Sequence, residues 1–469
     1  MSDLAGTDQV VVDFTAPRAG TAPLTWGQKA IWQDMQDSGG QFSMGGRAPV
    51  PEGSTVADVA ALLGSLMGRH AALRMRLGTD DAGRPGQVVA GSGQISLDIM
   101  TLPDDAEVVP FAVHLMDTWP LTRFDFGHDW PLRMAVLRQR GACRYLVWVL
   151  SHLVADGGAH LLFLDDLIAV RDGGAAAGQS RRRDILDIAD GERAPQARQL
   201  SSRAMRYWES ALRHIPAETF GPPGRPLDQP GRLLDQPGKQ FWQARFTSPA
   251  AQASMLAIAR RTGTDASRVT LALIATAIGR ATGAAPLTIK VMVNNRFRPG
   301  LADVIAPIAQ NSVVTIDVAD ISVDEAVARS RSATLTAGMR AYYDPDDLAE
   351  VTAQLDAERG YPARVTCRVN DQRAMIMRAD GQAAAGQVTP EQISQKLAET
   401  SLTWLGPREH MHEQANILIE NRTDAVSLHM MWDRSCLTDA QVEALLRGVE
   451  EVAVEAAFDP SAPTKVSAR

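Results

Sequence analysis

The chain has 469 residues, and a typical unit of roughly 100–200 residues predicts two to four structural units. Hydrophobic residues make up 45% and charged residues 22%, which is typical of a globular protein and excludes wholesale disorder and a fibrous repeat. The formal net charge of −8 argues against a nucleic-acid-binding protein with a broad basic face.

The cysteines and the apolar runs of the sequence indicate the cellular compartment in which the protein is expected. Cys143, Cys367 and Cys436 are widely spaced, which predicts neither a disulfide framework nor a zinc cluster and favours a reducing, cytoplasmic compartment. The first ten residues are polar, so no signal peptide is expected. The sequence has no run of about 18 apolar residues, so no membrane-spanning helix is expected either.

The first elements follow simple patterns. Residues 9–14 form a β-branched run typical of a strand. Residues 25–35 predict a helix that begins after Thr25, with a glutamine three residues later as in a capping box. Residues 55–70 place apolar side chains at helical spacing, and residues 72–77 alternate as a strand does.

A strand, a polar turn and a helix then follow in succession. Residues 144–150 (RYLVWVL) predict a buried strand, and residues 159–170 predict an apolar helix. Between them, residues 151–158 (SHLVADGG) form a loop before the positive N-terminus of the helix, a common layout for a functional site.

Residues 174–183 are polar, residues 199–214 predict a helix, and residues 221–239 are dense in Pro and Gly, as in a linker or hinge. Alternating strands and helices continue beyond it, with strands at 240–246, 287–293, 311–318, 416–420 and 425–432, and helices at 249–262, 267–282, 323–340 and 438–456. The predicted fold is α/β or α+β in two lobes, 9–185 and 239–460, joined by a connecting helix and linker at 186–238.

The sharpest candidate for chemistry is the HxxxDG spacing of His152, Asp156 and Gly157. Histidine is the side chain best suited to move protons near neutral pH, and an aspartate four residues later could orient the loop. The spacing alone is not specific, because a buried loop histidine followed by a helix-capping aspartate has the same pattern. Arg296 ends a buried strand, and Asp156 is its natural partner if it is buried; the alternative is a solvated cation.

The remaining histidines are weaker candidates. His410 and His412 could bind a metal, although without a third ligand a polar loop is the simpler interpretation. His160 and His70 lie at helix ends, where capping, packing or the helix dipole explains them. The sequence has no Walker loop, GxSxG, GxGxxG or HExxH, so nucleotide, hydride and zinc-protease chemistry have no support.

Five segments carry a resemblance in matching order, namely 24–32 (LTWGQKAIW), 69–77 (RHAALRMRL), 150–157 (LSHLVADG), 206–212 (RYWESAL) and 294–312 (NNRFRPGLADVIAPIAQNS). They resemble the motifs of the condensation domains of nonribosomal peptide synthetases, and the resemblance spans almost the whole chain. Two departures stand out. Ser151 replaces the first histidine of the HHxxxDG motif, and Ala306 and Ile308 differ from the IGxF stretch.

The resemblance implies two chloramphenicol acetyltransferase-like lobes that form a V, with His152 near the middle of a tunnel between them. It implies that His152 orients or deprotonates the acceptor and that the Gly157 N–H contacts the oxyanion. Asp156 would be structural and paired with Arg296, beside Ser151 at the active site. No metal and no bound organic cofactor would be needed, because the phosphopantetheine arm belongs to a partner carrier protein.

The implied function is a free-standing condensation enzyme of antibiotic or other natural-product biosynthesis. It would join an acyl thioester on an acyl or peptidyl carrier protein to an amine or hydroxyl acceptor, with no nucleic-acid or membrane partner. Two alternatives stay open: a catalytically silent platform that binds a carrier protein or partner enzyme, and a CoA-dependent acyltransferase of the same broad superfamily.

Overall fold

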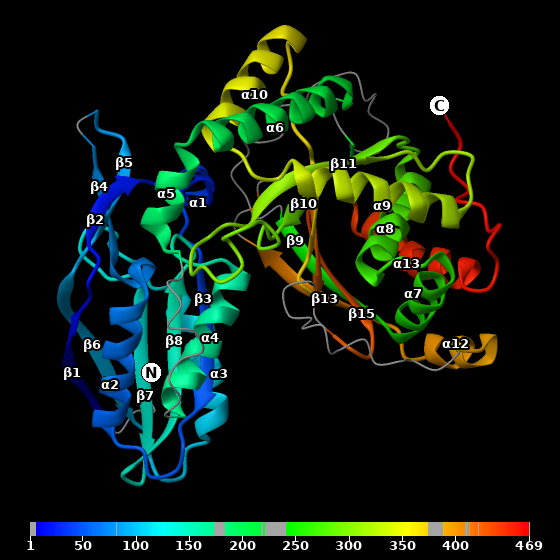
Figure 1. Cartoon of the computed structure of the whole chain (residues 1–469). Helices are drawn as coiled ribbons and strands as arrows, with labels where there is room; N and C mark the ends of the chain where they lie inside the picture. The colour runs from blue at the N-terminus through cyan, green and yellow to red at the C-terminus, as the bar shows by residue number, and fades with distance from the viewer. Residues whose placement is uncertain are drawn as a thin grey trace. The chain divides into compact units, whose positions relative to one another are not determined.

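Two compact units make up the chain in the computed structural model (Figure 1). The model describes residues 6–80, 82–172, 183–216, 219–220, 241–373, 388–408, 411, 413–420 and 422–468. Unit 1 comprises Met1–Arg198 and Asn294–Ala309, and unit 2 comprises Gln199–Val293 and Gln310–Arg469. The predicted mixed α/β fold in two units is confirmed. Residues 294–309, which the sequence-based organisation placed in the second lobe, belong to unit 1.

Unit 1 is built on a sheet with the strand order β1-β6-β7-β8-β3. Its strands are β1 (Gly6–Thr15), β3 (Ser43–Pro49), β6 (Ser92–Thr101), β7 (Leu132–Gln139) and β8 (Ala142–Ser151). Neighbours are antiparallel except the parallel pair β6 and β7. A smaller sheet has the order β2-β5-β4, with β2 (Gly20–Pro23), β4 (Met75–Thr79) and β5 (Pro85–Val89).

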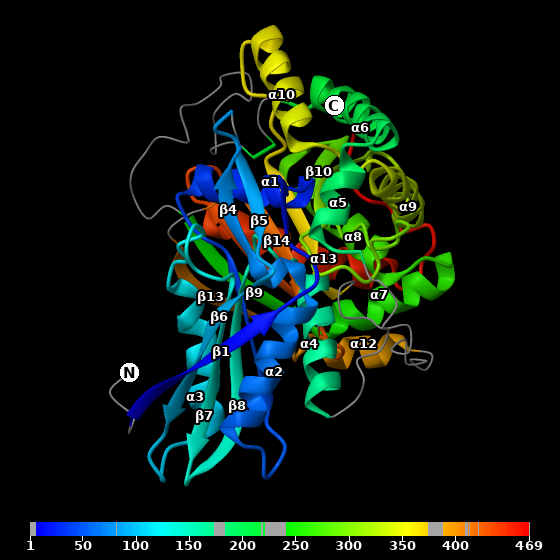
Figure 2. The same cartoon turned by 60° about the vertical axis from the view of Figure 1, so that its left-hand side comes forward.

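Helices cover both faces of the larger sheet of unit 1. They are α2 (Val56–Arg69), α3 (Val108–Thr118) and α4 (Gly157–Arg171). The unit also contains α1 (Trp26–Ser38), α5 (Ile185–Glu192) and short 3-10 turns at Ala71–Arg74 and Trp119–Leu121. Val147 of β8 packs with Ala112 of α3. The next residue, Trp148, faces the other way and contacts Phe163 of α4, whose neighbour α2 lies on the same face (Figure 2).

Unit 2 contains a sheet with the strand order β11-β10-β12-β14-β15-β9-β13. Its strands are β9 (Phe241–Ser248), β10 (Leu287–Val293), β11 (Gln310–Ile316), β12 (Cys367–Asp371), β13 (Ser401–Arg408), β14 (Ala415–Glu420) and β15 (Val426–Asp433). β12 is parallel to both of its neighbours, and the other pairs are antiparallel.

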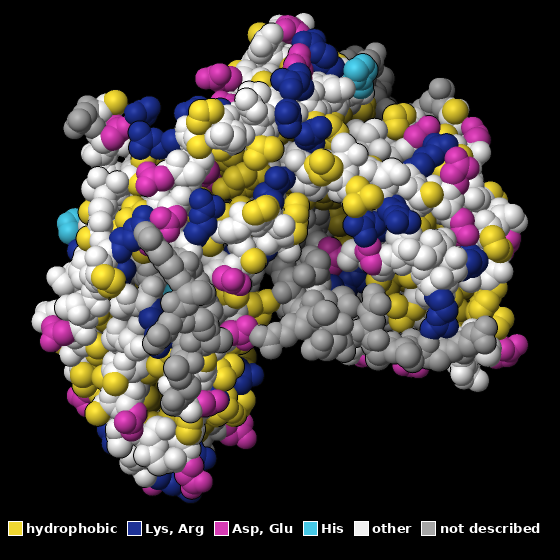
Figure 3. Space-filling view, viewed as in Figure 1, with side chains coloured by type: hydrophobic (Ala, Val, Ile, Leu, Met, Phe, Trp, Pro, Cys, Tyr) yellow, Lys and Arg dark blue, Asp and Glu magenta, His cyan; other side chains and the backbone are white. Residues whose placement is uncertain are grey.

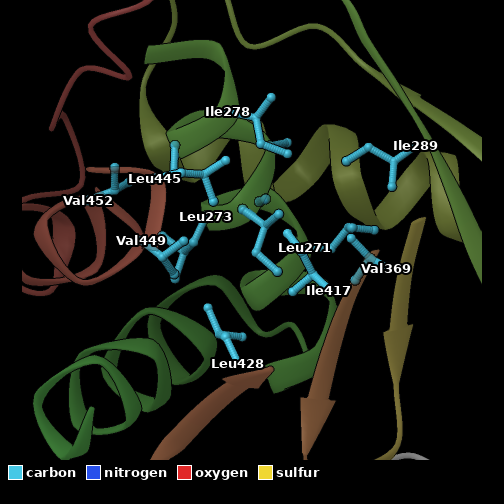
Figure 4. Packing of buried hydrophobic residues seen from close by; sticks show 14 of the residues in the cluster. Leu271, Leu273, Ile278, Ile289, Val369, Ile417, Leu428, Leu445, Val449 and Val452 are labelled. Carbon is cyan, nitrogen blue, oxygen red and sulfur yellow. The ribbon is translucent and has the colours of Figure 1, made fainter. Parts of the chain in front are cut away.

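The helices of unit 2 share one hydrophobic core with its sheet. They are α6 (Pro195–His214), whose first residues to Arg198 belong to unit 1, α7 (Pro249–Thr262), α8 (Ala266–Thr282), α9 (Val323–Met339), α10 (Pro345–Arg359), α12 (Pro390–Leu397) and α13 (Asp439–Ala456). Figure 4 shows Leu271 and Leu273 of α8, Leu445 and Val449 of α13 and Ile417 of β14, all at most 5% exposed. This buried contact fixes the position of α8 and α13 on one face of the sheet.

Several predicted elements agree with the structure to within a few residues, and the reason is local. The Thr25 hydroxyl accepts a hydrogen bond from the Gln28 N–H, and the Gln28 side chain bonds back to the Thr25 N–H, so the capping box that begins α1 is present. The strand predicted at 72–77 is wrong over its first half, which forms a 3-10 turn. Buried Arg74 holds that turn by donating to the carbonyl oxygens of Met67, Arg18 and Ala90.

Other segments escaped the sequence patterns. The sequence of β3 (SMGGRAP) has weak strand propensity. Glycine is required there because Trp148 of β8 packs directly against Gly46, where a Cβ would lie only 2.3 Å from Trp148 Cζ2. The polar stretch at 174–183, except its last residue, and the linker at 221–239 lie outside the described residues. On the face that Figure 3 shows, cationic and anionic side chains are interspersed.

The packing of residues 294–309 within unit 1 generates a prediction at Gly27. A Cβ on Gly27 of α1 would lie 1.7 Å from the Pro307 carbonyl oxygen, so Gly27→Ala should lower the free energy of unfolding by at least about 2 kcal/mol. Gly338→Ala is the matched control, because nothing lies within 4 Å of a Cβ there and alanine favours the helix by about 0.5–1 kcal/mol. Urea unfolding measures both variants; equal effects would contradict this packing.

Candidate active site

Two hydrogen bonds hold the backbone of the loop after β8 next to His152. Ser151 is fully buried, and its hydroxyl oxygen accepts a hydrogen bond from the Leu153 N–H at 3.2 Å. The His152 N–H donates to the Phe42 carbonyl oxygen at 2.8 Å, just before β3. These bonds fix the backbone on both sides of the His152 side chain, so the imidazole projects from an ordered turn.

His152 retains an unused ring nitrogen. Its side chain is half-buried, and Nδ1 is buried with no hydrogen-bond partner in the part of the chain that the structure describes. Because an unpartnered buried nitrogen is costly, such a group is typical of a position where a ligand or reacting atom completes the hydrogen bond.

Asp156 connects the loop to a distant part of the chain. Oδ1 accepts from the Ala159 N–H at 2.7 Å, which caps α4, and from Arg296 Nη2 at 2.6 Å. Oδ2 accepts from the N–H groups of Ile308 and Ala309, each at 2.9 Å. The residue is 3% exposed, and four donors occupy its acceptor capacity. The carboxylate is therefore fully engaged in holding structure.

Arg296 organises the segment that contains it. Its Nη1 donates to the Val304 carbonyl oxygen at 2.8 Å, and Nη2 also reaches the Ala306 carbonyl oxygen at 3.2 Å. The side chain is 13% exposed, and its charge faces that of Asp156 within unit 1. The structure thus brings together these two site residues, 140 positions apart in the sequence.

The glycines at the start of α4 have different places in the site. Gly157 is the first residue of α4, directly after its Asp156 cap. Sequence reasoning missed Gly158, where a Cβ would lie 2.2 Å from Arg296 Nε. Only a residue without a side chain lets the guanidinium lie against the helix there. The double glycine of SHLVADGG was the available signal, but its partner is not visible in the local sequence.

Two other histidines have structural partners. His160 accepts a hydrogen bond from the Trp148 indole N–H at 3.1 Å, and burial lowers the pKa of His160. His70 Nε2 lies 3.1 Å from an Asp166 carboxylate oxygen on α4. His410 and His412 lie outside the described residues. Among the described residues, no three metal-ligating side chains converge on a common point.

A cavity of about 800 Å³ lies elsewhere, in unit 2. Residues of α6 and α9 and the adjoining ends of β10 and β11 line it. Its polar groups are engaged within the fold, since the Tyr207 hydroxyl donates to the Val313 carbonyl oxygen and the hydroxyls of Thr288 and Thr315 pair at 2.9 Å. None of the predicted site residues lines this cavity.

Across the described ranges, no helix has both the length and the apolar character that a bilayer crossing requires.

Comparison with known proteins supplies independent findings. The family model described as "Condensation domain" matches residues 18–362. Phosphinothricin tripeptide synthetase PhsC of Streptomyces viridochromogenes is 26% identical over 309 residues, which cover 64% of this chain. The same match covers 28% of that synthetase, so the chain spans a little over a quarter of this relative's length.

Solved structures agree on the fold. The condensation domain that mediates chain release from the enacyloxin polyketide synthase has a TM-score of 0.69 at 19% identity, covering 95% of this chain and 84% of that one. The X-domain of teicoplanin biosynthesis, solved in complex with OxyB, has a TM-score of 0.65 at 19% identity, covering 97% of each chain. At these identities the likeness shows a shared fold.

The ion pair at Asp156 can be tested by an isosteric change. Asp156→Asn leaves the buried Arg296 without a counter-charge, so we expect the free energy of unfolding to fall by about 3–5 kcal/mol. Asp172→Asn at the other end of α4 is the control, because its ion pair with Arg171 is exposed and should leave the unfolding midpoint unchanged. Urea unfolding followed by circular dichroism measures both variants. We also expect His152→Ala to lower the free energy of unfolding less than Asp156→Asn does. Equal midpoints for the three variants would contradict the structural role of the pair.

The environment of His160 predicts a pH dependence. Because burial lowers the folded-state pKa of His160 below its unfolded value near 6.5, its contribution to stability is present above about pH 6.5 and is lost as the pH falls toward the folded-state pKa. His160→Gln keeps an acceptor for the Trp148 N–H and should flatten the fall in melting temperature between pH 7 and pH 5. His128→Gln, at an exposed position, should keep the wild-type slope. Parallel slopes for all three proteins would contradict this assignment.

Proposed function

Because the chain belongs to the condensation-domain family, we propose that it joins an acyl group held as a thioester on a carrier protein to an amine or hydroxyl acceptor. The product is an amide or an ester, and the setting is natural-product biosynthesis in the cytoplasm. The observation that supports the proposal most directly is His152, whose buried Nδ1 has no partner among the described residues and which precedes the capped start of α4 by five positions.

In the proposed reaction, His152 accepts the proton of the acceptor amine or hydroxyl as that nucleophile attacks the thioester carbonyl carbon. The tetrahedral intermediate then collapses, the carbon–sulfur bond breaks, and the thiolate leaves with a proton returned by His152. Asp156 is unsuited to the role of base, because its oxygen atoms already accept from four donors.

The start of α4 supplies the electrostatic part of the proposal. Gly157 is the first helical residue, and no described residue accepts a hydrogen bond from its N–H. A free N–H at the positive end of a helix suits the developing oxyanion of the intermediate. Asp156 and Arg296 act as positioning residues, since they fix the loop and the helix start on which His152 and Gly157 lie.

The reaction as proposed draws on no metal and no organic cofactor held by this chain. The acyl group arrives on the phosphopantetheine arm of the carrier protein, so the thioester is a property of the partner. In this proposal, His152 is the base, the Gly157 N–H stabilises the oxyanion, and the Asp156–Arg296 ion pair fixes the loop, which is the set of groups that acyl transfer from a thioester requires.

A second candidate function is a binding platform without catalysis. Ser151 replaces the first histidine of the family motif, and the similar X-domain of teicoplanin biosynthesis is known in complex with OxyB. As a platform, this chain would bind a carrier protein or a partner enzyme and His152 would be dispensable.

His152→Ala should lower product formation at least tenfold, because it removes the proposed base, which contributes typically 10²–10⁴-fold. The assay offers acyl groups as carrier-protein thioesters and as CoA thioesters, with mixed amine and alcohol acceptors, and detects product by mass spectrometry. His128→Ala is the control, because that side chain is 86% exposed and should keep wild-type turnover.

The outcomes separate the candidates. Product that requires both the carrier and His152 supports condensation, and its mass distinguishes an amide from an ester. Turnover with acyl-CoA alone would indicate a CoA-dependent acyltransferase. Tight carrier binding with no product from any donor would favour the platform.

A further inference from the structure

The cavity of unit 2 has dimensions suited to an elongated ligand. It occupies about 800 Å³ between α6 and α9, beside the adjoining ends of β10 and β11 (Figure 1). This volume falls within the range of small-molecule sites. α9 borders the cavity from Ala328 to Thr336, a length of about 12 Å at 1.5 Å per residue. An extended chain of about ten covalent bonds spans that distance, because each bond advances the chain by about 1.2 Å.

Small side chains form both helical walls of this groove. They are Ser210 and Ala211 of α6 and Ala328, Ser332, Ala333 and Thr336 of α9. Several hydroxyls at the groove are already engaged, because Tyr207 donates to the Val313 carbonyl oxygen and Thr336 to that of Ser332. The ring of Tyr207 and Pro286 add apolar surface. The groove therefore favours a ligand whose body is apolar.

One end of the groove carries more negative than positive charge. Arg329 Nη1 lies 3.3 Å from an Asp317 carboxylate oxygen, and Nη2 lies 2.6 Å from one of Glu325. Two carboxylates thus share one guanidinium, so this end does not attract a further anion.

The opposite end carries cations without partners. Helical spacing places Arg340 one turn beyond Thr336 on the wall of α9 and Arg203 one turn before Tyr207 on the wall of α6. Neither arginine side chain has a hydrogen bond or ion pair within the part of the chain that the structure describes. Burial raises the pKa of Tyr207, and the nearby positive charge of Arg340 opposes that shift, so the half-buried guanidinium lies close to the Tyr207 end. This end therefore favours an anionic group.

We propose that the groove between α6 and α9 binds a medium-chain fatty acid. Its carboxylate pairs with Arg340 and Arg203 at the Tyr207 end, and its alkyl chain lies along the small side chains of the two helices. The charges set the direction of the ligand, because a carboxylate at the other end would face two further carboxylates. Binding is independent of the proposed acyl transfer, since the groove contains no residue of the His152 loop.

Isothermal titration calorimetry on the full chain, with decanoate below its micellar concentration, tests the proposal. We expect saturable binding of one equivalent. Decylamine should bind at least tenfold more weakly, because its ammonium group would face the arginines. Hexanoate should also bind at least tenfold more weakly, because four fewer methylene groups leave water. Absence of saturable binding up to millimolar decanoate, or equal affinities for decanoate and decylamine, would overturn the proposal.

Matched variants on α9 locate the site. Arg340→Gln removes the proposed partner of the carboxylate and should weaken decanoate binding about tenfold, whereas Arg331→Gln, exposed and outside the groove, should leave it unchanged. Ser332→Trp should weaken binding at least tenfold by filling the groove, and Arg331→Trp is its control. Ser332 is exposed, so we expect wild-type melting temperatures, which are measured for each variant.

Two results would contradict the assignment. Equal affinities for Arg340→Gln and Arg331→Gln would overturn the role of the cationic end. Wild-type affinity in a folded Ser332→Trp variant would place the fatty acid outside the groove; if that variant does not fold, the comparison at Arg340 decides.

Discussion

The ion pair between Asp156 and Arg296 is the constraint on which the geometry of the candidate site depends. Removing two charges from water costs several kcal/mol each, and their attraction offsets this only when the remaining hydrogen-bonding capacity is filled. Here the carboxylate also accepts from Ala159, Ile308 and Ala309, and the guanidinium donates to two carbonyl oxygens of its own segment. The pair therefore connects the start of α4 to residues 294–309. Because His152 lies only four residues before Asp156, the same pair also fixes the position of the His152 turn.

Close backbone approach makes this arrangement possible. Gly158 leaves room for the Arg296 guanidinium, and Gly27 leaves room for the Pro307 carbonyl oxygen. Within residues 294–309, the Ile308 and Ala309 contacts to Asp156 come from backbone N–H groups, so the identity of their side chains matters less. This explains why Ala306 and Ile308 can differ from the family's IGxF stretch while the loop still closes on the carboxylate.

The sequence predicted those features whose causes are local. Capping residues such as Thr25 and the apolar run of β8 act within a few positions, and the HxxxDG spacing identified the loop. The strand β3 was missed because tertiary packing against Trp148 overrides its glycines. The membership of residues 294–309 in unit 1 and the role of Gly158 depend on contacts between segments far apart in the sequence, which local sequence patterns do not reveal.

The replacement at Ser151 bears on whether the site can act. In the structure the buried Ser151 hydroxyl accepts from the Leu153 N–H, which stabilises the turn through a hydrogen bond that a small hydroxyl makes readily. The next residue carries the imidazole with the unpartnered Nδ1, and Asp156 is saturated by its own partners. In the proposed reaction, the loop conformation depends on Ser151 and Asp156, and proton transfer depends on His152. Under the proposed function, loss of the first motif histidine removes neither the turn nor the base.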